Sequence, residues 1–257
     1  MSETLLDPTD NTDDRFLGGR VRAFQPKLGF RAAIDSVLLP AAIESGNGLE
    51  ILDAGLGCGI ASLCLLARLP EVRITGIENQ QELAELAAIN AERNGFAFDV
   101  LATDFIAWRG KKQFDQVMTN PPYFEAGRGT QSPVRTKARA NAGPATKAWI
   151  EQCIAHLKPG GMLTLIHRAD CEKEILAALD GRAGHAEIIP FLPRAGEAPR
   201  RILLRARKGA ASGVKWLPGF ILHGKETKYT EAAEGVLRYG HPISWVDYKA
   251  DTEAEAR

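Results

Sequence analysis

Short apolar segments alternate with longer amphipathic segments from about Gly48 onward. Apolar runs bounded by Gly, Pro, Asp or Asn predict buried strands, and apolar residues repeating every three to four positions predict helices. Seven strands are expected, at residues 49–55, 73–78, 98–104, 114–120, 162–168, 186–193 and 200–208. Helices are expected between them, at residues 60–69, 80–95, 145–161 and 172–180. This alternation predicts a Rossmann-like, doubly wound α/β fold around a mainly parallel seven-stranded sheet.

Other parts of the chain depart from this alternation. The short link between residues 186–193 and 200–208 predicts a hairpin, so one antiparallel strand is expected at the edge of the sheet. A short strand within 216–224 and a helix at 230–240 should follow. We expect a disordered acidic N-terminus at residues 1–14, one domain at 15–245 and a tail at 246–257. A loop is expected at 124–144, and loops of this length are usually functional or disordered.

Composition narrows the possible classes of protein. The chain has 257 residues, of which 45% are hydrophobic and 25% charged, so it can build a core without disulfides. This composition excludes intrinsic disorder, collagen, coiled coil and disulfide scaffold. Lys and Arg total 32, as do Asp and Glu, so binding to a nucleic acid requires local basic patches. The four cysteines form no CxxC pair, which favours free thiols and no metal site.

The expected location is the cytoplasm, without a membrane anchor. No uncharged segment approaches the 18 apolar residues of a spanning helix. The N-terminus has several acidic residues and neither Lys nor Arg in its first 14 positions, whereas a signal peptide needs a basic start and an apolar segment.

Three polar motifs come at the ends of three successive predicted strands. The first, Asp53-Ala-Gly55-Leu-Gly57-Cys-Gly59, forms a glycine-rich turn that lets backbone approach a ligand. The dinucleotide pattern GxGxxG fails here, because its third glycine would fall at Ile60. The second is Glu78 with Asn79, where an acid accepts both ribose hydroxyls of a nucleoside or simply caps the next helix.

The third of these motifs is Asp104-Phe105. Its acid can accept a hydrogen bond from the amino group of adenine, and its ring can pack on the base. The alternative is a solvated acid in a loop. Because carboxyl ends of parallel strands meet at one edge of a sheet, the three motifs predict a single nucleoside site.

The fourth motif, Asn120-Pro121-Pro122-Tyr123, is the most specific. An aryl amine is a poor nucleophile because its lone pair is delocalised into the ring. The Asn120 side-chain oxygen and the Pro121 carbonyl can accept its two hydrogens, which favours a pyramidal nitrogen with its lone pair facing the methyl donor. Both acceptors gain strength as positive charge develops. Tyr123 can stack on an extruded base. The bland alternative is a proline-rich turn with a surface tyrosine.

These motifs resemble those of a known family. The Asp53–Gly59 turn is similar to the first motif of class I methyltransferases, which implies S-adenosylmethionine as cofactor. The tetrapeptide Asn120–Tyr123 resembles the catalytic motif of amino-methyltransferases, which act on adenine or on a glutamine amide. Residues 25–39 and the stretch LHGKETKYT resemble the TrmN-like enzymes that methylate adenosine in a valine tRNA. This resemblance covers about residues 15–240, and it implies that Arg31 or Asp35 contacts the methionine moiety. The bland interpretation of Asp35 is a helix cap.

Two basic segments could serve an RNA substrate. The 124–144 loop holds four cations against one acid, and it directly follows the predicted catalytic motif, where cations can bind phosphates. Its predicted RNA-binding residues are Arg128, Arg135, Lys137 and Arg139. The second segment, residues 194–215, is also basic, and its alternative is a solvated strand face.

The leading hypothesis is therefore an enzyme that methylates the 6-amino group of adenine in RNA. The resemblance favours a tRNA as that RNA. One alternative is a glutamine methyltransferase of the release-factor type, but those enzymes carry a longer N-terminal domain and only 52 residues precede Asp53. A guanine-modifying ribosomal RNA enzyme is another. A cofactor-binding module without catalysis, acting as a scaffold or RNA chaperone, belongs to a different class, and the intact Asn120–Tyr123 motif argues against it.

Overall fold

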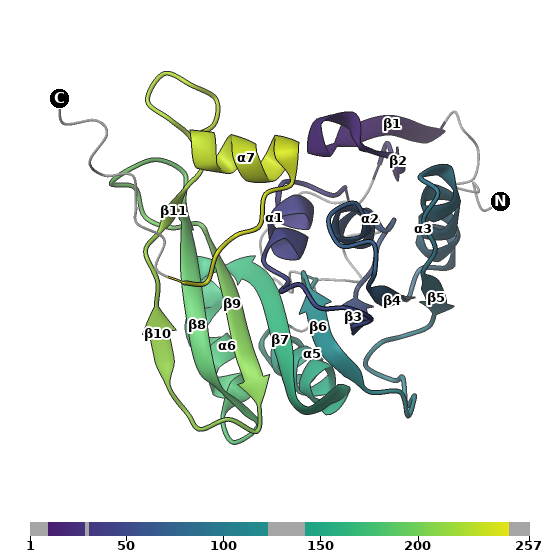
Figure 1. Ribbon diagram of the computed structural model, residues 1–257. Coiled ribbons are helices and arrows are strands. Elements are labelled where there is room, and N and C mark those ends of the chain that lie inside the picture. Colours follow the sequence, from purple (N-terminus) through teal and green to yellow (C-terminus); the bar gives the residue numbers. More distant parts are fainter. Residues whose placement is uncertain (1–9, 29–30, 123–141, 247–257) are drawn as a thin grey trace.

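A computed structural model describes residues 10–28, 31–122 and 142–246. A central sheet with helices on both faces dominates the molecule (Figure 1). Its strands follow the order β10-β8-β9-β7-β6-β3-β4-β5, and β11 also pairs with β8. The bounds of these strands are β3 Glu50–Ala54, β4 Arg73–Glu78, β5 Asp99–Ala102, β6 Phe114–Thr119, β7 Leu157–Arg168, β8 Ala183–Leu192, β9 Arg201–Lys208, β10 Val214–Trp216 and β11 Phe220–Ile221. The predicted Rossmann-like α/β fold is confirmed.

The antiparallel strand lies inside the sheet, so its predicted place at the edge was wrong. Strand β9 pairs antiparallel with β7 on one side and with β8 on the other. The hairpin from β8 to β9 was predicted correctly. However, the α6 crossover places β8 one strand away from β7, and β9 fills the gap between them. Strands β10 and β11 then pair with β8, which makes nine described strands rather than seven.

Both faces of the sheet are covered by helices. The helices are α1 Asp35–Ala41, α2 Ile60–Leu66, α3 Gln81–Arg93, α5 Ala142–Ala155, α6 Glu172–Leu179 and α7 Glu231–Tyr239. Adjacent residues of β6 point to opposite faces: Met118 joins the core formed with α1, α2 and α7, and Val117 joins the core formed with α5 and α6. Because β6 is buried on both faces, its apolar residues need not alternate with polar ones, and the neighbours Val117 and Met118 are both buried.

The N-terminal segment forms a hairpin, whereas disorder was expected through Asp14. Strand β1, Asn11–Phe16, pairs antiparallel with β2, Val21–Pro26, and the short helix η2, Leu17–Gly19, joins them. The expectation was wrong for residues 11–14 because their acids are paired with cations. Asp13 binds Arg22 and Arg93, over 2.5 and 2.7 Å. Residues 1–9 and 247–257, and with them most of the predicted termini, lie outside the described residues.

Burial in the described chain ends after Trp245. Trp245 is 5% exposed and donates from its indole nitrogen to the carbonyl of Ala42, whereas Val246 is 79% exposed. Among the described residues, none of the helices is both long and apolar enough to cross a membrane. The same residues contain no cluster of three or more His, Cys, Asp or Glu that could hold a metal ion.

Candidate active site

The predicted motifs meet at the carboxyl edge of four neighbouring strands, in the order β6, β3, β4 and β5. Ala54, the last residue of β3, is paired with Thr119 of β6 on one side and with Ile77 of β4 on the other. Glu78, the last residue of β4, is paired with Ala102 of β5. Asn120, the glycine turn, Glu78 and Asp104 each follow or end one of these strands, so they share one edge.

The glycine turn bends back over the end of β4. The backbone N–H groups of Gly55 and Leu56 donate to the carbonyl of Ile77, over 3.0 and 2.9 Å. Gly55 and Gly59 have φ angles of 84° and 87°, a region that side chains disfavour. A Cβ atom at Gly55 would lie 3.3 Å from the Trp149 ring. The turn therefore needs glycine at position 55 for both conformation and space, and it leads into the start of α2.

Asp53 connects the two ends of this turn. Its carboxylate is 2% exposed and accepts a hydrogen bond from the Ser62 hydroxyl over 2.7 Å, which links β3 to α2. Burial raises the pKa of Asp53 to about 7, and the nearby Glu78 charge adds to the rise, while the Ser62 hydrogen bond opposes it. The side chain of Asp53 therefore serves the predicted cofactor site indirectly, by positioning the glycine turn.

Glu78 ties the glycine turn to the end of β4. Its Oε2 accepts from the N–H of Gly57 over 2.8 Å, and its Oε1 accepts from the N–H of Gln80 over 3.0 Å. The side chain is 7% exposed, and the following Asn79 is exposed. Each carboxylate oxygen can accept more than one hydrogen bond, so Glu78 keeps the capacity predicted for ribose hydroxyls.

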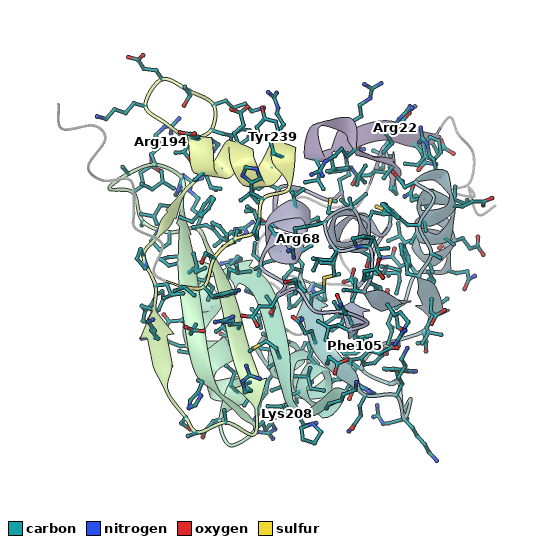
Figure 2. The ribbon with its side chains drawn as sticks, in the orientation of Figure 1. Arg22, Arg68, Phe105, Arg194, Lys208 and Tyr239 are labelled. Carbon is teal, nitrogen blue, oxygen red and sulfur yellow. The ribbon has the colours of Figure 1, made fainter. Side chains whose placement is uncertain are left out.

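The Asp104-Phe105 motif divides into an exposed and a buried half. Asp104 is exposed, and its Oδ1 accepts from the N–H of Ile106 over 2.9 Å. Phe105, labelled in Figure 2, is 2% exposed. Its ring centroid lies 4.8 Å from that of Trp149. The hypothesis that the Phe105 ring packs on adenine is therefore wrong for this structure, because the ring belongs to the core beneath the site.

The residue before the predicted catalytic motif anchors it to the glycine turn. Thr119 donates from its hydroxyl to the carbonyl of Ala54 over 2.7 Å, and it accepts from the indole N–H of Trp149 over 3.0 Å. Asn120 and Pro122 are half-buried, and Pro121 is buried. Tyr123 lies outside the described residues. Sequence reasoning missed Trp149, since an apolar position in a helix predicts core packing and gives no signal for a hydrogen bond.

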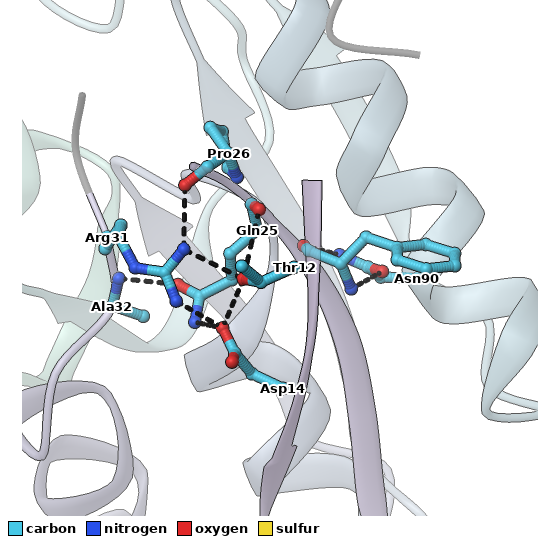
Figure 3. Close-up of polar contacts among 8 residues, drawn as sticks. Thr12, Asp14, Gln25, Pro26, Arg31, Ala32 and Asn90 are labelled. Carbon is cyan, nitrogen blue, oxygen red and sulfur yellow. Dashed lines mark hydrogen bonds and ion pairs between the residues drawn. The ribbon is translucent and has the colours of Figure 1, made fainter. Parts of the chain in front are cut away.

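Arg31 and Asp35 are held in place by other parts of the chain. Arg31 donates to the Asp14 carboxylate over 2.6 Å and to the Thr12 hydroxyl and the Pro26 carbonyl, which fixes the segment before α1 against the hairpin (Figure 3). Asp35 forms an ion pair with Arg201 over 3.0 Å.

The helix-cap interpretation of Asp35 was wrong. The cap position of α1 is Ile34, and no side chain makes a cap hydrogen bond there. Asp35 is instead the first helical residue. Arg201 is the first residue of the antiparallel β9 and is paired with Arg168 at the end of β7. Asp35 therefore lies at the carboxyl edge of the sheet.

The basic segment 194–215 contributes mainly to the fold. Arg205 binds Glu187 over 2.6 Å and also pairs with Glu44, while Lys208 donates to the Leu157 carbonyl over 2.7 Å. Arg207 likewise donates to the carbonyl of Gly160. Hydrogen bonds thus join β9 to its neighbours through these cations. The four predicted RNA-binding cations of the loop, Arg128, Arg135, Lys137 and Arg139, lie outside the described residues.

Comparison with known proteins gives consistent matches. The family model "Methyltransferase small domain" matches residues 33–189. A tRNA1(Val) (adenine(37)-N6)-methyltransferase from Glaesserella parasuis is 30% identical over 173 residues, which are 66% of this chain and 73% of the relative. The same name is carried by a relative from Porphyromonas gingivalis, which is 30% identical over 70% of this chain and 75% of its own length.

A solved structure adds to these matches. The crystal structure of a predicted O-methyltransferase from Agrobacterium tumefaciens superposes with a TM-score of 0.67 at 27% identity, over 84% of this chain and all of that one.

Proposed function

The chain belongs to the methyltransferase small domain family, and from this premise we propose that it methylates the 6-amino group of adenine in a tRNA. S-adenosylmethionine is its methyl donor. The relatives that carry the name of a tRNA adenine-N6 methyltransferase align over most of their own length, which supports a tRNA as substrate. Such a substrate is consistent with a cytoplasmic enzyme.

The residues at the carboxyl edge fit this cofactor. The turn with positive φ angles at Gly55, Gly57 and Gly59 is proposed to pass beneath the amino-acid end of the cofactor, and Glu78 supplies two carboxylate oxygens for ribose hydroxyls. Asp104 is an exposed acceptor at the next strand end, suited to an adenine amino group. Arg31, Asp35 and Asn79 remain proposed to contact the cofactor. When bound, S-adenosylmethionine supplies a methyl group on a positively charged sulfur.

The observation that carries the proposal is the fixed position of Asn120 beside the glycine turn. The Thr119 hydroxyl holds the start of the motif to Ala54, the last residue before that turn, and Pro121 restricts the backbone that follows. In our proposal, the Asn120 side-chain oxygen and the Pro121 carbonyl accept the two amino hydrogens of adenine. The nitrogen lone pair is then directed at the donor, and positioning supplies much of the rate. Tyr123 is proposed to stack on the base.

Two other methyl acceptors carry an NH2 group that could donate to the Asn120 side-chain oxygen and the Pro121 carbonyl. They are a glutamine amide of a release factor and the 2-amino group of guanine in ribosomal RNA. The three substrates are separated by one experiment. The protein is incubated with S-adenosylmethionine labelled in its methyl group and with tRNA, ribosomal RNA or release factor in separate reactions. Label in tRNA alone is the expected result, and label in release factor or ribosomal RNA alone would replace the proposal by the matching alternative.

The four loop cations, Arg128, Arg135, Lys137 and Arg139, remain a prediction for phosphate binding. Their support is the composition of the segment and its place directly after the Asn120–Tyr123 motif.

A further inference from the structure

A wide groove runs between the N-terminal hairpin and the C-terminal helix. Its volume is about 1130 Å³, and its walls are the end of β1, η2, the start of α1, residues 227–229 and α7. Figure 1 shows η2 and α7 side by side at the top of the molecule. Arg20 joins the two walls by donating to the Tyr239 carbonyl over 2.7 Å. Two segments more than 200 positions apart in the sequence thus build one surface.

The groove carries an excess of positive charge. Four cations line it, Arg15, Arg20, Lys228 and Arg238, against the single acid Glu234. Glu234 lies 3.3 Å from Arg238 in an ion pair whose side chains are 45% and 59% exposed. Exposed pairs of this kind are weak, so the Arg238 guanidinium can bind a stronger anion. The whole chain is neutral by formal charge, which makes this concentration of cations a local feature.

Aromatic rings lie among these cations. Tyr239 is 58% exposed on α7 (Figure 2), and Tyr229 is stacked on His223 with 5.4 Å between ring centroids. Tyr229 is half-buried, so the exposed ring of Tyr239 is the one that offers a face on which an unpaired base or sugar can pack, and exposed rings beside cations are typical of surfaces that bind single-stranded or looped nucleic acid.

One wall of the groove adjoins a residue at the carboxyl edge of the sheet. Ile34 and Val37 line the groove, and Asp35 between them is paired with Arg201 at the carboxyl edge of the sheet. Arg31, which precedes them, is fixed to the hairpin by Asp14. An RNA strand lying in the groove would therefore pass close to the carboxyl edge of the sheet, at the end of β7, the neighbour of β6.

We propose that this groove binds the phosphate backbone of the substrate RNA next to the nucleotide that is methylated. The inference rests on the proposed function for the identity of the RNA, and it adds a docking surface made of Arg15, Lys228 and Arg238. These three cations would neutralise successive phosphates, while Arg20 holds the two walls together.

The test compares two triple variants of the full chain. The groove variant carries Arg15→Gln, Lys228→Gln and Arg238→Gln. The control carries Lys111→Gln, Lys158→Gln and Arg182→Gln, which removes the same charge at the amino ends of β6, β7 and β8, the opposite edge of the sheet. Affinity for tRNA is measured at several salt concentrations, methyl transfer to tRNA is measured in parallel, and calorimetry gives the affinity for S-adenosylmethionine.

We expect the groove variant to bind tRNA at least ten-fold more weakly and to keep its cofactor affinity. Its plot of log K against log salt should flatten by about 0.7–0.9 for each phosphate that the variant no longer neutralises. The control should keep both the affinity and the slope of the native protein. Native-like tRNA binding by the groove variant, or equal losses in both variants, would overturn the docking surface while leaving the proposed function intact. Failure of the native protein to methylate tRNA would instead reject the proposed function, and the groove's partner with it.

Discussion

Asn90 on α3 and Asn94, the C-cap residue of that helix, lie one turn apart, and the side-chain amide of each pairs with the backbone of a β2 residue. Asn90 accepts from the N–H of Phe24 over 2.8 Å and donates to its carbonyl over 3.0 Å. Asn94 makes the same two bonds to Arg22, over 2.9 and 2.7 Å. Two side chains thus replace a strand at the edge of the hairpin, because a helical turn matches the spacing of alternate strand residues.

We predict that Asn90→Ala lowers the free energy of unfolding by about 2–4 kcal/mol, because it leaves buried backbone groups without partners. Asn90 is fully buried and also donates to the Cys58 carbonyl in the glycine turn, over 2.9 Å. Asn94→Ala is the matched control: its partner Arg22 is exposed to water, so the expected loss is about 1 kcal/mol or less. Denaturant unfolding of both variants checks this, and equal losses would contradict the assigned difference.

Glu78→Ala should weaken binding of S-adenosylmethionine by about 100-fold or more. The variant loses two hydrogen bonds to the ribose, each contributing about 1.5–3 kcal/mol when the acceptor is charged. Calorimetry measures the change, with thermal unfolding to show that the variant is folded. The control is Glu92→Ala on the exposed side of α3, which should bind the cofactor as the native protein does. Unchanged affinity in folded Glu78→Ala would refute the ribose assignment.

Asn120→Ala should reduce the turnover number by about 100-fold or more and leave cofactor affinity near its native value. The proposed acceptor matters mostly in the transition state, where the amino nitrogen gains positive charge. Single-turnover methyl transfer and calorimetry measure the two quantities separately. A variant with near-normal turnover would rule out the catalytic role, and a parallel loss of cofactor binding would indicate a collapsed site instead.

Asp53 should make stability depend on pH. Its folded pKa of about 7 lies above the usual 3.8, so its contribution is fully present below pH 3.8 and is lost as the pH rises through 7. The free energy of unfolding of the native protein should therefore fall relative to that of Asp53→Asn between pH 5 and 8, by at most about 1.4 kcal/mol per pH unit. Parallel stability curves for the two proteins would show that the carboxyl is not perturbed.

Strand and helix positions could be predicted from the sequence wherever a segment is buried on both faces. The segment 114–120 illustrates this, because Phe114, Val117, Met118 and the final Asn120 predicted both the strand and the place where it ends. Prediction was wrong where the structure of a segment depends on ion pairs with distant parts of the chain. The acids at Asp13 and Asp14 resemble a solvated tail until Arg22, Arg31 and Arg93 are placed beside them.

In the candidate site, too, some features could be predicted from the sequence and others could not. Motif residues at strand ends were found because parallel strands bring their carboxyl ends together, and that rule needs no side-chain detail. Side-chain roles were less predictable: Phe105 looked available for a base, yet its ring packs against Trp149 in the core. Ser62 and Thr119 position the motifs by hydrogen bonds that no local pattern signals.

The identity of the methylated nucleoside tests the proposed adenine methylation of tRNA most directly. Transfer RNA is treated with the native protein and labelled S-adenosylmethionine, digested to nucleosides and analysed by mass spectrometry, with Asn120→Ala as the matched control. We expect N6-methyladenosine as the labelled product of the native protein and almost none of it with the variant. Label in a guanine base or on a ribose oxygen, or equal product from the variant, would contradict the proposal.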